Sequence, residues 1–185
     1  MSSKIFYIVL LCFITLTLPV MAKSGGTAWV LVDVNEHTLT VYDKGKLQEQ
    51  FKNISLGRGG VGFSRQQGDG KTPLGQFQVS WVNRNSRYYL FFGLDFPNLD
   101  YAHRAFTTNL INATELAAIT SAFNEHRQPP QNTKLGGYIG IHGVGQGDIE
   151  VHNRFNWTDG CVALTNQQIE RLSQWVQIGT NVVIF

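Results

Sequence analysis

The residues TDGCVAL, Thr158–Leu164, place a cysteine directly after a glycine and at the start of a short apolar run. The run CVAL at 161–164 is short and apolar, which predicts a buried strand. A second short apolar run, YIGIHG at 138–143, is also predicted to be a strand and carries His142 near its end. Two such strands bring Cys161 and His142 together if they are neighbours in one sheet.

Further strands are predicted on both sides of this pair, because runs rich in Val, Thr and Tyr alternate with Asn, Asp and Gly turns. These strands are predicted at 27–34, 37–43, 46–57, 75–83, 87–94 and 181–185. Capping sequences at Asn112–Glu115 and Thr165–Gln168 are each followed by apolar residues at helical spacing, which predicts two helices. The 19 glycines and the sparse charges also favour a β-rich domain with many turns.

The first 22 residues have the layout of a secretory signal peptide. Lys4 gives a positive start, Ile5–Leu18 is apolar apart from two threonines, and small residues precede a cut after Ala22. The apolar run is short for a membrane span, which needs about 20 residues. We therefore expect export to the periplasm or cell envelope, one domain over 23–185, and no transmembrane domain after cleavage. An uncleaved anchor is the alternative.

The charges and cysteines narrow the possible functions. The net charge is +2, without a basic stripe, so nucleic acid is not expected as a partner. Cys12 lies inside the predicted signal peptide, so its cleavage leaves Cys161 without an intramolecular partner. In an oxidising compartment an unpaired thiol is reactive, pairs with another chain, or is buried and inert, and its neighbours decide among these.

A thiol and an imidazole on adjacent strands suggest nucleophilic catalysis. A free thiol has a pKa of about 8.5, and an imidazole within hydrogen-bond reach takes its proton and holds the thiolate by charge. Gly160 lets a substrate approach the backbone, whose N–H groups then bind the oxygen anion formed on attack. We therefore predict an ionised, solvent-open sulfur at Cys161 beside His142.

The sequence also contains residues that fit two other kinds of site, a metal site and a dinucleotide site. His142, His152 and Cys161 are all metal-ligand types, and their spacing alone does not reject a metal. Residues 57–62 match G-x-G-x-x-G, which in a dinucleotide site leads from a strand into a helix. The following FSRQQGDGKTPLG is polar and broken by Gly and Pro, so a dinucleotide site is disfavoured.

Three segments, in this order, resemble motifs of the YkuD-type L,D-transpeptidases. Gly57 through KTPLGQF at 71–77 resembles the glycine-rich strand end and T-P-x-G-x-F element of that family. IHG at 141–143 resembles its I-H-G, and 158–164 resembles its [S/T]-x-G-C-[I/V]-x-[L/M] signature. The resemblance extends over essentially the whole chain after the predicted signal peptide. It implies a mainly β catalytic domain, sandwich-like or barrel-like, with two peripheral α-helices.

The resemblance also implies roles for particular residues. Cys161 would be the nucleophile and His142 the general base, with the carbonyl of Gly143 holding the other imidazole nitrogen. The backbone N–H groups around Asp159, Gly160 and Cys161 would form the oxyanion hole. Neither a metal nor another cofactor is implied, because the energy of the broken amide is kept in a thioester.

The implied substrate is the stem peptide of peptidoglycan, cut between its third residue, an L-diamino acid, and the terminal D-alanine. A side-chain amine of another stem would then form a 3→3 cross-link, or an amine on an envelope protein would be attached. Attack by water would instead give an L,D-carboxypeptidase, or a hydrolase that releases wall-linked protein. From another class, a non-catalytic β domain that binds wall or metal stays open.

Two positions depart from the family pattern. Asp159 stands where many members have His, and Ala163 where many have Arg. The resemblance implies that this arginine contacts substrate, so other side chains are expected to bind the stem carboxylate through bidentate hydrogen bonds, unless they are ordinary surface charges. The candidate substrate contacts are Arg84, Arg87, Arg104 and Thr158.

Overall fold

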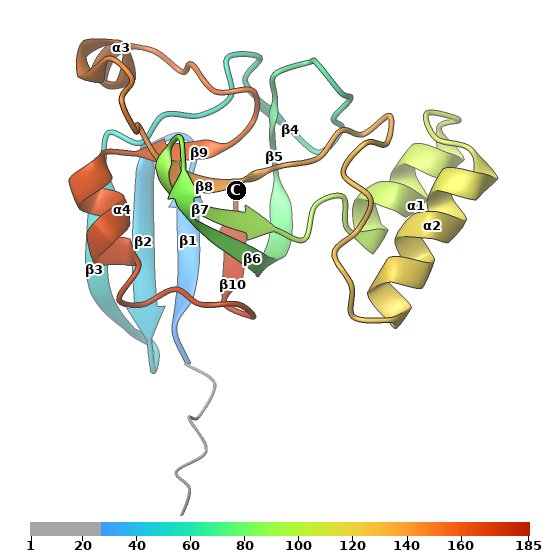
Figure 1. The fold of residues 1–185 in the computed structure, drawn as a ribbon, viewed down its shortest axis with the longest axis horizontal. Helices are drawn as coiled ribbons and strands as arrows, with labels where there is room; N and C mark the ends of the chain where they lie inside the picture. The colour runs from blue at the N-terminus through green and yellow to red at the C-terminus, as the bar shows by residue number, and fades with distance from the viewer. Residues whose placement is uncertain (1–26) are drawn as a thin grey trace, which may run out of the picture.

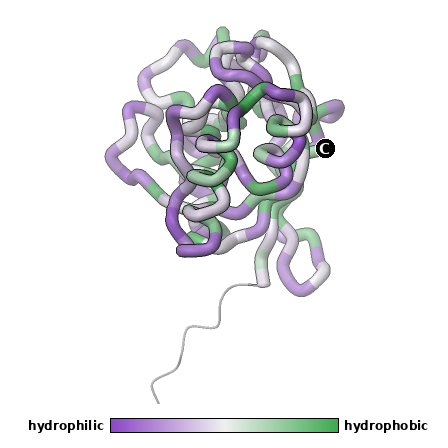
Figure 2. The backbone as a smooth tube through the Cα atoms, turned by 90° about the vertical axis from the view of Figure 1, so that its right-hand side faces the viewer, coloured by the Kyte–Doolittle hydropathy of each residue, from purple (hydrophilic) through white to green (hydrophobic). Residues whose placement is uncertain are grey.

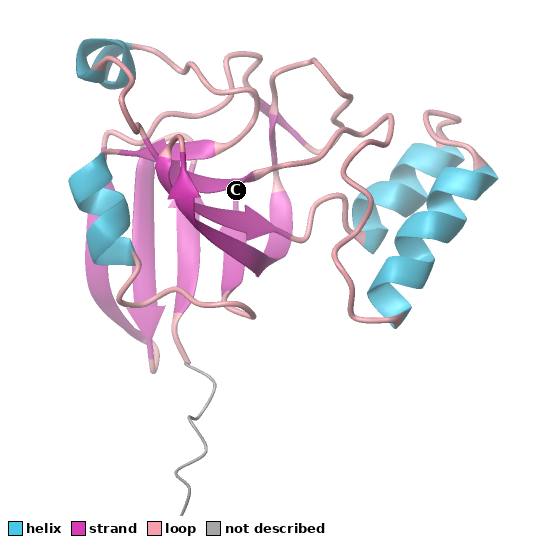
Figure 3. Cartoon of the chain, viewed as in Figure 1, coloured by secondary structure: helices cyan, strands magenta, loops and turns pink. Residues whose placement is uncertain are grey.

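The structure, a computed structural model, describes residues 27–185, so the predicted signal peptide at 1–22 lies outside the described residues. The described range is mainly β, as predicted, and its strands and helices are shown in Figures 1 and 3. The strands are β1 (Trp29–Asp33), β2 (Thr38–Asp43), β3 (Lys46–Lys52), β4 (Val61–Gly62), β5 (Thr72–Pro73), β6 (Gly75–Ser86), β7 (Tyr89–Leu94), β8 (Gly140–Gly143), β9 (Val162–Leu164) and β10 (Asn181–Ile184). The helices are α1 (Leu99–Thr107), α2 (Ala113–Asn124), α3 (Ile149–Arg154) and α4 (Asn166–Leu172).

Across residues 27–185, eight strands form one sheet in the order β3-β2-β1-β10-β6-β7-β8-β9, and β4 pairs separately with β5. β1, β2 and β3 form the predicted antiparallel meander, while β10 returns to lie parallel to β1. The sheet is not closed as a barrel, because β3 and β9 are its two edges. Bridges from Ser55 to Ala163 and from Gly57 to Thr158 nevertheless bring the segment after β3 alongside the β9 edge.

A cluster of buried side chains joins the two halves of the sheet. It contains Val30 and Val32 from β1 together with Phe92 from β7 and Ile141 from β8, all fully buried. Such burial is the main favourable contribution to folding, at about 25 cal/mol per Å² of apolar surface. α4 packs against β7, β8 and β9 and buries Ile169 in the same cluster. The core therefore fixes β8, which contains His142, and β9, which directly follows Cys161.

Two helices begin where the sequence predicts. The side chains of Asn112 and Thr165 cap α2 and α4, and the acid or amide three residues later completes a capping box at each. α1 and α3 were not predicted. α1 packs on α2 at one side of the molecule (Figure 1), and Figure 2, viewed from that side, shows hydrophilic and hydrophobic positions interspersed along both. Within the described residues, every helix is too short or too polar to cross a membrane.

Candidate active site

Strand pairing brings the predicted nucleophile and base to one place. β8 runs parallel to β9, and His142 is in register with Ala163. Cys161 lies two residues before Ala163, and residues two apart in an extended chain point to the same face. Cys161 and His142 both line a cleft of about 600 Å³, whose other walls include Tyr88 and Trp157.

The imidazole of His142 is held on several sides. Its Nδ1 lies 2.7 Å from the carbonyl oxygen of Gly143, and because a carbonyl only accepts, Nδ1 carries the proton and Nε2 is the basic nitrogen. Tyr88 stacks on the ring at 4.2 Å between centroids, and Trp157 meets it edge-on at 5.7 Å. Burial lowers the pKa of His142 to about 4, so the ring is neutral at neutral pH.

The thiol of Cys161 is half-buried and donates a hydrogen bond to the carbonyl oxygen of Tyr138 at 3.3 Å. Burial raises the pKa of Cys161 to about 11, although a hydrogen bond from the backbone of Gly140 favours the thiolate. The thiol is therefore protonated at neutral pH, which differs from the ionised sulfur expected from sequence. The physical reason is the burial of the sulfur, which disfavours the charged thiolate more than Gly140 and the positive charge of Arg65 favour it.

The side-chain hydroxyl of Thr158 stabilises the turn from Thr158 to Cys161. Thr158 is buried, and its Oγ1 donates to the carbonyl of Cys161 at 2.7 Å and accepts from the N–H of Gly160 at 3.1 Å. Gly160 has a φ of +121°, and a Cβ there would lie 2.4 Å from the carbonyl oxygen of Lys71, so only glycine fits. The N–H of Gly160 is thus already bonded. Those of Asp159 and Cys161 make no hydrogen bond to any described part of the chain.

Arg65, which the sequence analysis missed, is the buried cation of this site and is 5% exposed. Its guanidinium donates to the carbonyl oxygens of Lys71 and Asp159, each at 3.0 Å, and to that of Leu135. Burial lowers its pKa from the ordinary arginine value. The Asp159 carbonyl belongs to the peptide bond that enters Gly160, so Arg65 fixes the orientation of the turn before the cysteine.

The predicted substrate contacts separate in space. Arg87 lines the cleft, with its guanidinium 4.7 Å from the centroid of the Tyr88 ring. Arg84 does not line the cleft, since the residues on either side of it do and strand alternation turns it to the other face. Arg104 lies on α1 in a different cavity. Thr158 does line the cleft, but its hydroxyl is engaged as described above.

Asp159 and His152, two further polar residues near the cleft, each have a protein partner. The carboxylate of Asp159 pairs with Arg58 at 2.8 Å, with both side chains exposed. His152 does not line the cleft, because its Nδ1 accepts from the indole N–H of Trp157 at 3.3 Å and the ring is buried behind it. In residues 27–185 no group of three or more His, Cys, Asp or Glu is placed to hold a metal ion.

The family is established by comparison with known proteins. The model of the YkuD family, described as an L,D-transpeptidase catalytic domain, matches residues 27–184. The chain therefore belongs to the YkuD family of L,D-transpeptidase catalytic domains. No curated protein matches this chain.

Solved structures share the fold. The helical cell shape determining protein Pgp2 from Campylobacter jejuni is 26% identical, with a TM-score of 0.56, over 87% of this chain and 48% of that one. Bd1075 from Bdellovibrio bacteriovorus is 19% identical, with a TM-score of 0.53, over 86% of this chain and 48% of that one. The chain thus spans about half the length of these two proteins.

Proposed function

We propose that the chain is an exported peptidoglycan L,D-transpeptidase that uses Cys161 as its nucleophile and His142 as its general base. One observation carries the proposal: the thiol and the imidazole line the same cleft, and the Gly143 carbonyl directs the basic nitrogen of the ring away from the backbone. Arg87, at the cleft wall, is proposed to bind a stem carboxylate.

The first half of the reaction starts from a neutral pair. The thiol turns from the Tyr138 carbonyl to Nε2 of His142 and gives up its proton as sulfur attacks the amide carbon of the stem peptide. The carbonyl oxygen becomes an anion, which the N–H groups of Asp159 and Cys161 bind. The carbon–nitrogen bond then breaks, and D-alanine leaves with the proton that His142 held. A thioester remains on Cys161.

The second half transfers the acyl group. An incoming amine attacks the thioester carbon, and His142 takes the proton that the amine loses. The sulfur–carbon bond breaks, and the proton returns to the sulfur of Cys161. The product is a new amide, a 3→3 cross-link when the amine belongs to another stem. Water in place of the amine gives a carboxylic acid by the same steps, which is the carboxypeptidase outcome.

The test is to incubate the protein with muropeptides that carry tetrapeptide stems and to follow Cys161 and the products by mass spectrometry. We expect a thioester adduct on Cys161, release of D-alanine, and cross-linked products. Cys161→Ala should form neither adduct nor product, and His142→Asn should reduce the rate of adduct formation strongly. If the products are trimmed stems without cross-links, the enzyme is a hydrolase instead of a transferase. Absence of both adduct and product would refute catalysis and favour a binding domain.

Export is part of the proposal and has its own test. The signal-peptide layout of residues 1–22 and the expected wall substrate both support an envelope location. Mass analysis of the protein from an envelope fraction should find an N-terminus at Lys23. An intact N-terminus in that fraction would mean that the segment is kept as an anchor. Recovery of the protein only with the cytoplasm would contradict export.

A further inference from the structure

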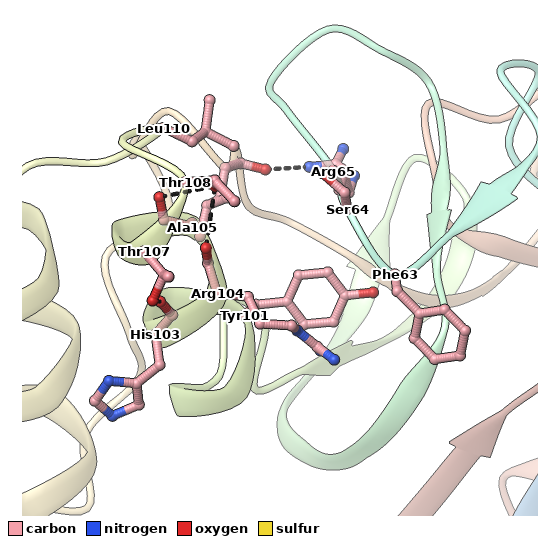
Figure 4. Close-up of a pocket in the computed structure, with 11 residues that line it drawn as sticks. Phe63, Ser64, Arg65, Tyr101, His103, Arg104, Ala105, Thr107, Thr108 and Leu110 are labelled. Atoms are coloured by element: carbon pink, nitrogen blue, oxygen red, sulfur yellow. Dashed lines mark hydrogen bonds between the residues drawn. The ribbon is translucent and has the colours of Figure 1, made fainter.

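A second cavity lies between α1 and the segment that follows β4, and we name it the α1 cavity. Its volume is about 460 Å³, within the range of small-molecule and short-peptide sites. Phe63, Ser64 and Arg65 line one wall, and Tyr101 and Arg104 line the other (Figure 4). Arg65 also lines the catalytic cleft, so the two hollows share one buried side chain.

Arg104 has the geometry of an anion receptor. Its guanidinium carbon lies 4.9 Å from the ring centroid of Tyr101 and 5.9 Å from that of Phe63, and Figure 4 shows it beside the Tyr101 ring. Tyr101 is itself fixed, because its hydroxyl lies within hydrogen-bond distance of the carbonyl oxygens of Leu74 and Gly62. Stacking on aromatic faces orients a guanidinium while its in-plane N–H groups stay available.

Arg104 follows Asp100 by one helical turn on α1 but makes no ion-pair contact with it. In the part of the chain that the structure describes, Arg104 forms no ion pair, and no acidic side chain lines the α1 cavity. The floor is apolar, with Ala105, Leu110 and Leu135. A ligand that matches this lining has a carboxylate for the guanidinium and a small apolar group beside it, which describes a short acidic peptide better than a phosphate or a purely apolar molecule.

We infer that the α1 cavity is a second binding site for a carboxylate-bearing peptide, with Arg104 as the residue that holds the carboxylate. This inference rests on the proposed function, and the occupant is a second stem peptide. Its acidic residue supplies the carboxylate, and its alanine supplies the small apolar group. The site is separate from the cleft that holds Cys161, so one domain engages two stems at once.

The test is a titration of the tripeptide stem, L-Ala–γ-D-Glu–L-diamino acid, into the Cys161→Ala protein by calorimetry. This probe has no D-alanine to remove, so the measurement does not depend on turnover. We expect Arg104→Gln to weaken binding about tenfold, as loss of a charged hydrogen-bonded pair does. Phe63→Ala, on the opposite wall, should weaken it as well, and added salt should weaken binding to the parent protein.

Matched arginine variants decide which hollow is occupied. Arg84→Gln removes an exposed guanidinium outside both hollows and should leave the affinity unchanged. If Arg87→Gln abolishes binding while Arg104→Gln and Phe63→Ala do not change it, the peptide occupies only the catalytic cleft and the inference is overturned. Absence of measurable binding to the parent protein overturns it too. The proposed function is judged separately, by thioester formation on Cys161 in the unmodified protein.

Discussion

The thiol of Cys161 is hydrogen-bonded to the main-chain carbonyl of Tyr138, 3.3 Å away, and Tyr138 holds a left-handed backbone with a φ of +55°. Residues other than glycine adopt that conformation at a cost of about 1 kcal/mol or more, and such residues are frequent near functional sites. In this conformation the Tyr138 carbonyl accepts from the sulfur. The resting sulfur is therefore a bonded thiol, which in the proposed mechanism must leave Tyr138 before it reacts through His142.

The pH dependence of Cys161 alkylation follows from its raised pKa. Only the thiolate reacts with iodoacetamide, so the rate of modification should rise with a midpoint near pH 11. Reaction at pH 7 should be slower than that of free cysteine, contrary to the expectation from sequence. Peptide mass spectrometry of the Cys161 adduct, from pH 6 to beyond pH 11 so that the midpoint is bracketed, measures this. Protein unfolded in urea is the control and should return to the ordinary midpoint of about 8.5. A folded-state midpoint at or below that value contradicts the prediction.

The stability of the fold should depend on the protonation of His142. Unfolded histidine binds a proton near pH 6.5, whereas burial lowers the folded pKa to about 4. Acidification across that window therefore favours the unfolded chain, by about 3 kcal/mol in the free energy of unfolding. Burial raises the pKa of Asp95 to about 6, which acts in the opposite direction over much of the same window.

Comparison with His142→Asn isolates the histidine, because Asp95 is present in both proteins. Urea unfolding at pH 7 and at pH 4 gives the loss of stability on acidification for each. The parent protein should lose about 3 kcal/mol more than the variant. Equal losses in the two proteins would show that His142 titrates normally in the folded state.

Thr158→Val should damage the turn that presents the nucleophile. Valine has nearly the same shape but neither accepts from Gly160 nor donates to the carbonyl of Cys161. The buried N–H of Gly160 then lacks its partner, which costs about 1–3 kcal/mol. Adduct formation on Cys161 should fall at least about tenfold, as for loss of groups around an oxyanion site. Thr158→Ser keeps the hydroxyl and should retain most of the stability and most of the rate of adduct formation. Equal behaviour of the two variants would rule out the hydroxyl as the cause.

Arg65→Met should be strongly destabilising, because the carbonyl oxygens of Lys71, Leu135 and Asp159 lose a common donor. Unpaired buried acceptors cost about 1–3 kcal/mol each, so a total loss of about 3 kcal/mol or more is expected in urea unfolding. Arg84→Met, at an exposed strand position outside the cleft, is the control and should change stability by less than about 0.5 kcal/mol. A small effect at Arg65 would mean that water replaces its hydrogen bonds.

Local sequence signals predicted the parts of the fold that depend on local chemistry. The alternation in β1 and the capping boxes at Asn112 and Thr165 are properties of short segments, and the structure contains them. α1 was missed although its buried residues Tyr101, Ala102 and Ala105 fall at helical spacing and Asn98 caps its first turn, so the sequence did contain a signal for it. α3 has only six residues, which is too short for a periodic signal.

The candidate site divides in the same way. The pairing of Cys161 with His142 follows from two apolar strands, each with one reactive side chain, and the structure has those strands as neighbours. Arg65 carries no such signal, since a polar loop residue becomes buried only through contacts with segments distant in sequence. The thiol pKa likewise depends on burial by the surrounding chain and on Gly140 in β8, which is distant in sequence. The hydrogen bond from the N–H of Gly160 to the Thr158 hydroxyl could have been predicted, because a threonine side chain commonly accepts from the N–H two residues later in a turn.

The Gly143 carbonyl that orients His142 is part of the main chain, and this has a consequence for the inheritance of the site. An aspartate or asparagine in that role can be lost by a single codon change, whereas a peptide oxygen is present whatever amino acid is encoded. The oxygen itself is therefore never removed by a substitution, but its position depends on Gly143, because a Cβ there would lie 2.7 Å from Asn166 Oδ1 and 2.8 Å from the carbonyl oxygen of Tyr88. It is lost when β8 is displaced, so selection at this position acts on strand geometry, which the absence of a side chain at Gly143 preserves.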